Sequence, residues 1–170
     1  QQLLDTSSLL SKNETGINVV LVRFEDWSKA EDAATITAEI EQNVRDFILA
    51  LKSAIKSQVY LVCICPASHT TEHGYFYRQM EDLLASELAG ISGLYLVKSA
   101  ELLKSYPVAR FDDPHGEELG HIPYTPVFFT ALGTMITRKI HAIKRYPYKV
   151  IVLDEYGIRS KDSNIIKFDH

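Results

Sequence analysis

The chain lacks the short glycine motifs by which several large enzyme classes are recognised. Its 170 residues contain no G-x-G-x-x-G, no P-loop and no G-x-S-x-G. Dinucleotide-binding folds, phosphate-binding loops and the nucleophile elbow of α/β-hydrolases each depend on one of these glycine spacings. The sequence therefore gives no local support to any of these three classes.

The sequence also lacks an excess of basic residues and any long apolar run, and both absences limit the partners that we expect. The formal net charge is −4, so we expect no nucleic-acid partner, which would require a basic face. No apolar run approaches the roughly 20 residues that cross a bilayer, and the start QQLL has no charged-then-apolar secretory pattern. We therefore expect no membrane partner. With 46% apolar and 24% charged residues, the composition is that of one globular domain with a real core.

Cysteine is scarce, and its placement is informative. The two cysteines, Cys63 and Cys65, lie two positions apart in one apolar run. On a strand they would point to the same face, which is too constrained for a disulfide, and two thiols are too few for a structural zinc site. We expect buried, reduced thiols, a state that fits a cytoplasmic protein.

Four short apolar runs predict strands. They are NVVLVRF (18–24), VYLVCIC (59–65), LYLV (94–97) and KVIVL (149–153). Their nearly continuous apolar character is typical of strands covered on both faces. Helical spacing of apolar residues fills 30–57, 75–89 and 125–145, and the last helix is expected to start with Thr125 as its cap and Pro126 in its first turn. The alternation predicts an α/β fold with a mainly parallel sheet.

Function in such sheets gathers at the carboxyl ends of the strands. The segments expected there are 25–29, 66–74 and the residues from Lys98 onward. The stretch 105–125 shows no clear period, so we expect a functional loop there. The acids in FEDW (24–27) could bind a polar group, but first-turn acids of the next helix are the simpler interpretation.

His121 is the first candidate for catalysis. Glu118 stands three residues before it, and Asp112 makes a similar D-x-x-H pattern with His115. A carboxylate beside an imidazole fixes its tautomer and stabilises its charged form, as a general base requires. The competing interpretation is that His121 caps or packs against a loop backbone.

Ser68 and His69 form the second candidate. A serine beside an imidazole at a strand's carboxyl end could be an activated nucleophile. Adjacent residues on an extended chain point in opposite directions, however, so turn-forming roles explain the pair as well. His69 and His73, with Glu72 between them, could chelate a metal if both lay on one helix; we expect no bound metal.

Four segments bring a family into view: NVVLVRFEDW (18–27), VCICPAS (62–68), GHIPYTPVFFTALGTMITRKIHAIKR (120–145) and PYKVIVLD (147–154). Together they resemble the N-terminal part of FkbH-like proteins, members of the haloacid-dehalogenase superfamily (subfamily IIIC) from polyketide and nonribosomal peptide assembly lines. The resemblance spans about residues 1–154. It implies an SGNH-hydrolase-like three-layer α/β/α sandwich, followed in the family by a phosphatase-like domain that loads a glyceryl unit onto a carrier-protein thiol.

The sequence departs from the family pattern at the residues that carry chemistry. The family's phosphatase-like motif has aspartates at positions matching 154 and 156, but here Tyr156 follows Asp154 by two residues. Phosphoryl chemistry and a magnesium site are therefore not expected. By context, His121 matches the catalytic histidine of SGNH enzymes, Glu118 takes the place of their aspartate, and Ser68 falls near their oxyanion block. The G-D-S-like nucleophile block is not found.

The resulting expectation is a degenerate SGNH-like domain at 1–154, cut short at its N-terminus, with 155–170 as a tail in place of the phosphatase-like domain. It would serve as a structural or carrier-protein interaction module between neighbouring synthetase domains. One alternative is an acyltransferase or esterase-like enzyme acting on a carrier-bound acyl thioester, with His121 as base, Glu118 or Asp112 orienting it and Ser68 as nucleophile. Another is one part of a split glyceryl-loading enzyme. The chain itself is expected to hold no cofactor; the phosphopantetheine arm of an acyl or peptidyl carrier protein is the group it would meet.

Overall fold

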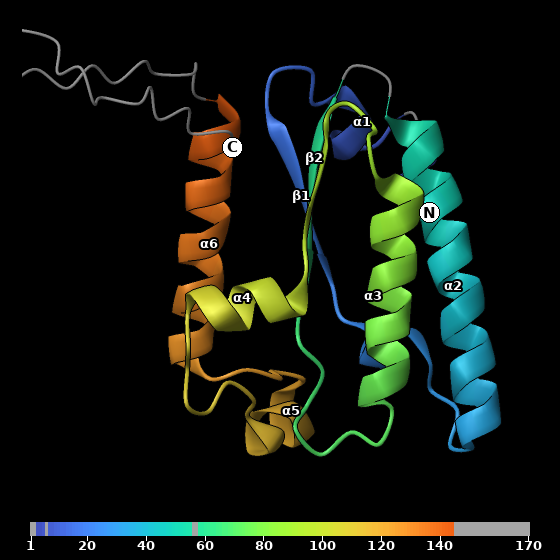
Figure 1. Ribbon diagram of the computed structural model, residues 1–170, viewed down its shortest axis with the longest axis vertical. Helices are drawn as coiled ribbons and strands as arrows, with labels where there is room; N and C mark the ends of the chain where they lie inside the picture. The colour runs from blue at the N-terminus through green and yellow to red at the C-terminus, as the bar shows by residue number, and fades with distance from the viewer. Residues whose placement is uncertain (1–2, 6, 56–57, 145–170) are drawn as a thin grey trace, which may run out of the picture.

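The computed structural model describes residues 3–5, 7–55 and 58–144. Its elements follow in the order α1 (Leu9–Lys12), β1 (Ile17–Val22), η1 (Phe24–Trp27), α2 (Ala33–Ala54), β2 (Val59–Ile64), α3 (Gly74–Leu88), β3 (Leu94–Val97), α4 (Ser99–Ser105), α5 (Pro114–Gly120) and α6 (Pro126–Lys144). Figure 1 shows a small sheet with α2 and α3 on one side and α6 on the other. The predicted mixed α/β class is confirmed.

The sheet is parallel, with the strand order β1-β2-β3. Val19 lies opposite Leu61, which in turn lies opposite Tyr95. The strands predicted at 18–24, 59–65 and 94–97 are confirmed to within two residues. All three carboxyl ends meet at the lower edge in Figure 1, near α5. The fourth predicted strand, 149–153, and the expected domain boundary at 154 lie outside the described residues.

Alternate side chains of β2 and of Cys65, which follows it directly, enter two different cores. Tyr60, Val62 and Ile64 pack with the buried faces of α2 and α3, whereas Leu61, Cys63 and Cys65 pack with α4 and α6. All six residues are at most 6% exposed. Because β2 is covered on both faces, its sequence is a continuous apolar run rather than an alternating one.

The two thiols are buried in the same core, as their spacing predicted. Both cysteines are free. Burial raises the pKa of Cys63 to about 11 and that of Cys65 to about 12, so both thiols stay protonated and packed as small apolar groups.

Two of the long helices begin at identifiable caps. The Asp32 carboxylate accepts the Thr35 N–H at 2.9 Å at the start of α2, and the Thr125 hydroxyl accepts the Phe128 N–H at 3.4 Å at the start of α6. The second contact confirms the predicted cap. A side-chain acceptor at this position satisfies one of the free N–H groups of the first turn. No helix in the described part of the chain is both long and apolar enough to span a bilayer.

Two local predictions were wrong. Residues 24–27 do not begin the long helix; they form the separate turn η1, in which the Phe24 and Trp27 rings pack edge to face 5.4 Å apart. The long helix begins later because Asp32 caps it. The stretch 105–125 is not irregular throughout, since it contains α5. That helix is only seven residues long, too short to show a period in the sequence.

Candidate functional site

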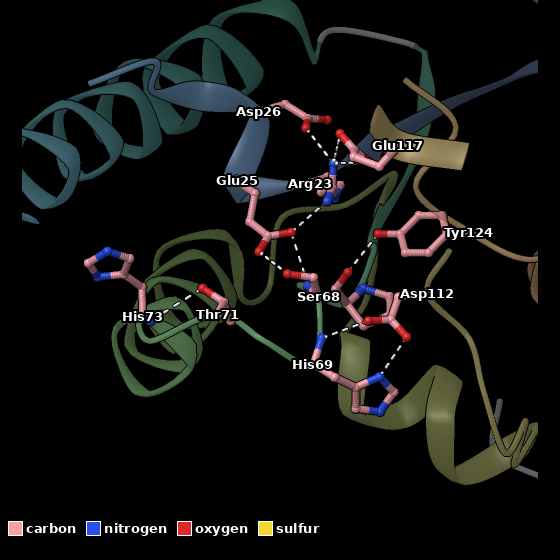
Figure 2. A network of polar contacts seen from close by, with 11 residues as sticks. Arg23, Glu25, Asp26, Ser68, His69, Thr71, His73, Asp112, Glu117 and Tyr124 are labelled. Atoms are coloured by element: carbon pink, nitrogen blue, oxygen red, sulfur yellow. Dashed lines mark hydrogen bonds and ion pairs between the residues drawn. The ribbon is translucent and has the colours of Figure 1, made fainter. Parts of the chain in front are cut away.

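The candidate site lies where the carboxyl ends of β1 and β2 meet the segment 111–125. β1 delivers Arg23 and Glu25, and β2 delivers Ser68 and His69. Asp112 forms an isolated antiparallel bridge with Tyr124, which places its carboxylate against the β2 exit. Figure 2 shows these side chains pointing toward one another from separate parts of the chain.

His69 and Asp112 form a tight pair, hereafter the dyad. His69 Nδ1 is 2.7 Å from Asp112 Oδ1, and the His69 backbone N–H donates to Asp112 Oδ2 at 3.0 Å. Burial acts to raise the pKa of Asp112, but the two hydrogen bonds from His69 outweigh it, so this pKa is lowered. The ionised carboxylate favours the tautomer with hydrogen on Nδ1, which leaves Nε2 as a proton acceptor.

The imidazole is positioned as well as paired. Its ring centroid lies 4.1 Å from that of Phe111, and its side chain keeps 55% exposure, whereas the Asp112 side chain keeps 10%. A buried carboxylate behind a solvent-accessible imidazole is the arrangement of a histidine general base and its orienting acid.

Ser68 is not bonded to the dyad. Its hydroxyl donates to Glu25 Oε1 at 2.8 Å and its backbone N–H donates to Glu25 Oε2 at 3.0 Å. Glu25 in turn pairs with Arg23 at 2.7 Å, so its negative charge is compensated. Two consecutive backbone N–H groups, those of Ser68 and His69, are therefore already committed to carboxylates.

Arg23 connects the elements around this site. Its guanidinium reaches Glu25, Asp26 and Glu117 within 3.0 Å and stands 5.8 Å from the centre of the Tyr124 ring. Its burial would lower its pKa, but the neighbouring carboxylates outweigh that effect and the pKa is raised. Arg23 is thus a fixed cation that fastens η1 and α5 to the end of β1.

A cavity of about 460 Å³ opens beside the dyad. We call it the edge cavity. Its lining consists of Pro66, Ala67, Ser68, His69, Thr71, Gly74, Tyr77, Arg78, Glu81, Ser99, Ala100, Leu103 and Phe111. A volume of this order suits a small organic group, because ligand pockets start at roughly 300 Å³.

The predicted site residues are only partly brought together. Ser68 and Asp112 lie at this edge, each beside His69. His121 and Glu118 are exposed at the end of α5, and neither side chain makes a hydrogen bond or ion pair within the described residues. His121 has left-handed backbone (φ 53°), and its N–H bonds to Glu117 O, so its backbone caps α5.

The geometry around His73 differs from that of a helical metal-binding pair. His73 is the cap of α3, which starts at Gly74, so His69 and His73 do not share a helix. Within the part of the chain that the structure describes, no group of three histidine, cysteine or acidic residues is arranged to hold a metal ion.

The reasoning from sequence missed Arg23 and the pairing of His69 with Asp112. The only available signal was positional: both the β1 exit and the β2 exit were expected at one sheet edge. Comparisons with protein-family models, curated proteins and solved structures found no match to this chain.

Proposed function

We propose that this domain catalyses acyl transfer or hydrolysis with His69 as general base and Asp112 as the residue that orients it. The 2.7 Å contact between His69 Nδ1 and Asp112 Oδ1 supports this proposal. General bases act within hydrogen-bond reach of the proton they remove, and His69 Nε2 is the proton acceptor of the dyad beside the edge cavity.

The proposed reaction runs without a covalent intermediate. An acceptor hydroxyl, or water, attacks the carbonyl carbon of an acyl thioester while its proton passes to His69 Nε2. The new C–O bond forms, the C–S bond breaks, and the imidazolium returns the proton to the leaving thiolate. The resemblance to FkbH-like proteins favours a thioester on the phosphopantetheine arm of a carrier protein as the substrate.

The contacts of Ser68 favour this direct path over an acyl-serine. Its hydroxyl is bonded to the charge-compensated Glu25 rather than to an imidazole. A serine nucleophile needs an adjacent base to take its proton, so Ser68 is assigned to holding the loop. The earlier expectation that His121 is the base remains a prediction that the experiment below separates from the assignment to His69.

We further propose that the domain is an SGNH-like three-layer sandwich. The parallel sheet with helices on both faces supports it, as does the meeting of a histidine and an acid at the carboxyl edge.

A second candidate function is the carrier-protein interaction module. Four exposed apolar side chains favour it: Leu119 (74%), Ile122 (52%), Val127 (64%) and Phe129 (43%). They lie on α5, on the loop that follows it and on the first turn of α6, close in sequence to the segment that supplies Asp112. Contiguous exposed apolar patches mark protein interfaces, and the nearness of these residues in sequence supports such a patch here.

One experiment tests both candidates. The domain is incubated with acyl-loaded carrier proteins, and acyl loss is followed by mass spectrometry for the wild type, His69→Gln, Asp112→Asn and His121→Gln. Turnover that falls at least about 100-fold in His69→Gln and survives in His121→Gln supports the dyad. The reverse pattern transfers the role to His121. Carrier binding without turnover supports the interaction module instead.

A further inference from the structure

The edge cavity contains one guanidinium that no carboxylate compensates. Arg78 lies in the lining together with His69. Among the described residues it forms no ion pair, in contrast to Arg23 and Arg45. Its guanidinium stands over the Tyr75 ring, whose centre is 6.0 Å from Arg78 Cζ. A cation in this position is available to a ligand.

The acids around the cavity are already engaged. Glu81 accepts a hydrogen bond from the hydroxyl of Ser99 at 2.5 Å and another from its N–H at 3.2 Å. Asp112 is paired with His69, and Glu25 with Arg23. Arg78 is therefore the cation of the lining that has no carboxylate partner among the described residues.

The N-terminus of α3 adds positive electrostatic potential to the edge cavity. Gly74, the first residue of this 15-residue helix, also lines the cavity, and Arg78 stands one turn further along. The first turn of α3 has no acidic residue, and its cap, His73, makes no side-chain hydrogen bond there. The helix dipole adds a partial positive charge to that of the guanidinium.

We infer that the edge cavity takes an acyl thioester that carries an anionic oxygen group, a carboxylate or a phosphate, bound by Arg78 while the thioester carbonyl faces His69. The inference rests on the proposed function for the identity of the reacting group. Arginine suits this task because its planar fork matches carboxylate and phosphate oxygens with two parallel hydrogen bonds.

The anionic group has two chemical sources, which matched substrates distinguish. Succinyl and butyryl thioesters of N-acetylcysteamine differ by a terminal carboxylate, and butyryl-phosphopantetheine and butyryl-pantetheine differ by a phosphate. For whichever source is correct, kcat/KM for the anionic member should exceed that for its neutral partner by about tenfold or more, the value of one charge-assisted hydrogen bond.

Arg78→Gln should reduce this ratio to about one, whereas Arg45→Gln, on an exposed arginine paired with Glu41 on α2, should leave the ratio unchanged. Equal preference in wild type and Arg78→Gln for both substrate pairs would overturn the inference.

If no thioester is turned over at all, the proposed function fails. NMR titration with succinate and with inorganic phosphate then tests whether the edge cavity binds an anion. Saturable binding that Arg78→Gln abolishes supports the anion site; no binding overturns it.

Discussion

Arg23 and Glu117 stand 94 residues apart in the sequence, yet Arg23 Nη1 lies 3.0 Å from Glu117 Oε2. This contact joins the end of β1 to α5. The same guanidinium holds Glu25, and Glu25 holds both the hydroxyl and the N–H of Ser68. The loop that carries His69 is therefore fastened, through two carboxylates, to elements far away in the chain.

Replacing Arg23 with methionine should destabilise the fold strongly. The Arg23 side chain is only 11% exposed, and removing one partner of a buried ion pair leaves the other charge uncompensated, at a cost of about 3 kcal/mol. Urea unfolding of Arg23→Met measures this loss. Arg45→Met removes an exposed pair with Glu41 and should cost no more than about 0.5 kcal/mol. Equal losses in the two variants would show that Arg23 has no special structural role.

Tyr124→Phe should also destabilise the segment that follows β2. The Tyr124 hydroxyl donates to Pro66 O at 2.6 Å in a buried environment. Without it the carbonyl is left unsatisfied, and the free energy of unfolding should fall by about 1–2 kcal/mol. Tyr75→Phe is the matched control, since Tyr75 is 69% exposed. Thermal or urea denaturation distinguishes the two, and a Tyr124→Phe protein as stable as wild type would contradict the prediction.

Asp112 should give the fold an acid-sensitive contribution. Its pKa is lowered in the folded state, against the effect of burial, by the hydrogen bonds from His69. The ionised form is thus favoured by folding, so the stabilisation is present above the unfolded pKa, about 3.9, and is lost as pH falls through the folded pKa. Below about pH 4 the stability of wild type should fall more steeply than that of Asp112→Asn. Urea midpoints across this range test it; parallel curves would exclude Asp112 as the source.

Cys63 and Cys65 should not react with a thiol-specific disulfide reagent at pH 8. Both are buried, with the pKa raised to about 11 for Cys63 and about 12 for Cys65. Only the thiolate is nucleophilic, and little of it exists three or more pH units below the pKa. Both thiols should react at once in denaturant. Rapid reaction of the native protein would show that the core between the sheet, α4 and α6 opens readily.

The strands were predictable because each carries its own local signal. The nearly continuous apolar runs at 18–24, 59–65 and 94–97 indicate strands that are buried on both faces, independently of the rest of the chain. The cap at Thr125 is local in the same sense. Physical chemistry within a few residues suffices for such features.

The site was less predictable because its contacts are long-range. His69 and Asp112 are 43 residues apart, and no pattern near Asp112 indicates that it turns toward His69 rather than toward His115 or His121. The deciding element is the bridge between Asp112 and Tyr124, which depends on α5. Because α5 spans just seven residues, its apolar spacing is too brief to be read.

The two hydrogen bonds between Asp112 and His69 restrict the rotation of the His69 side chain. One carboxylate bonds both the ring and the backbone N–H of the same residue, so the ring is held at a fixed position relative to its own backbone. The imidazole cannot rotate outward unless its hydrogen bond to Asp112 breaks. His69 Nε2 is therefore held in one orientation before a ligand binds. Binding then loses less conformational entropy than it would if the ring were free to rotate.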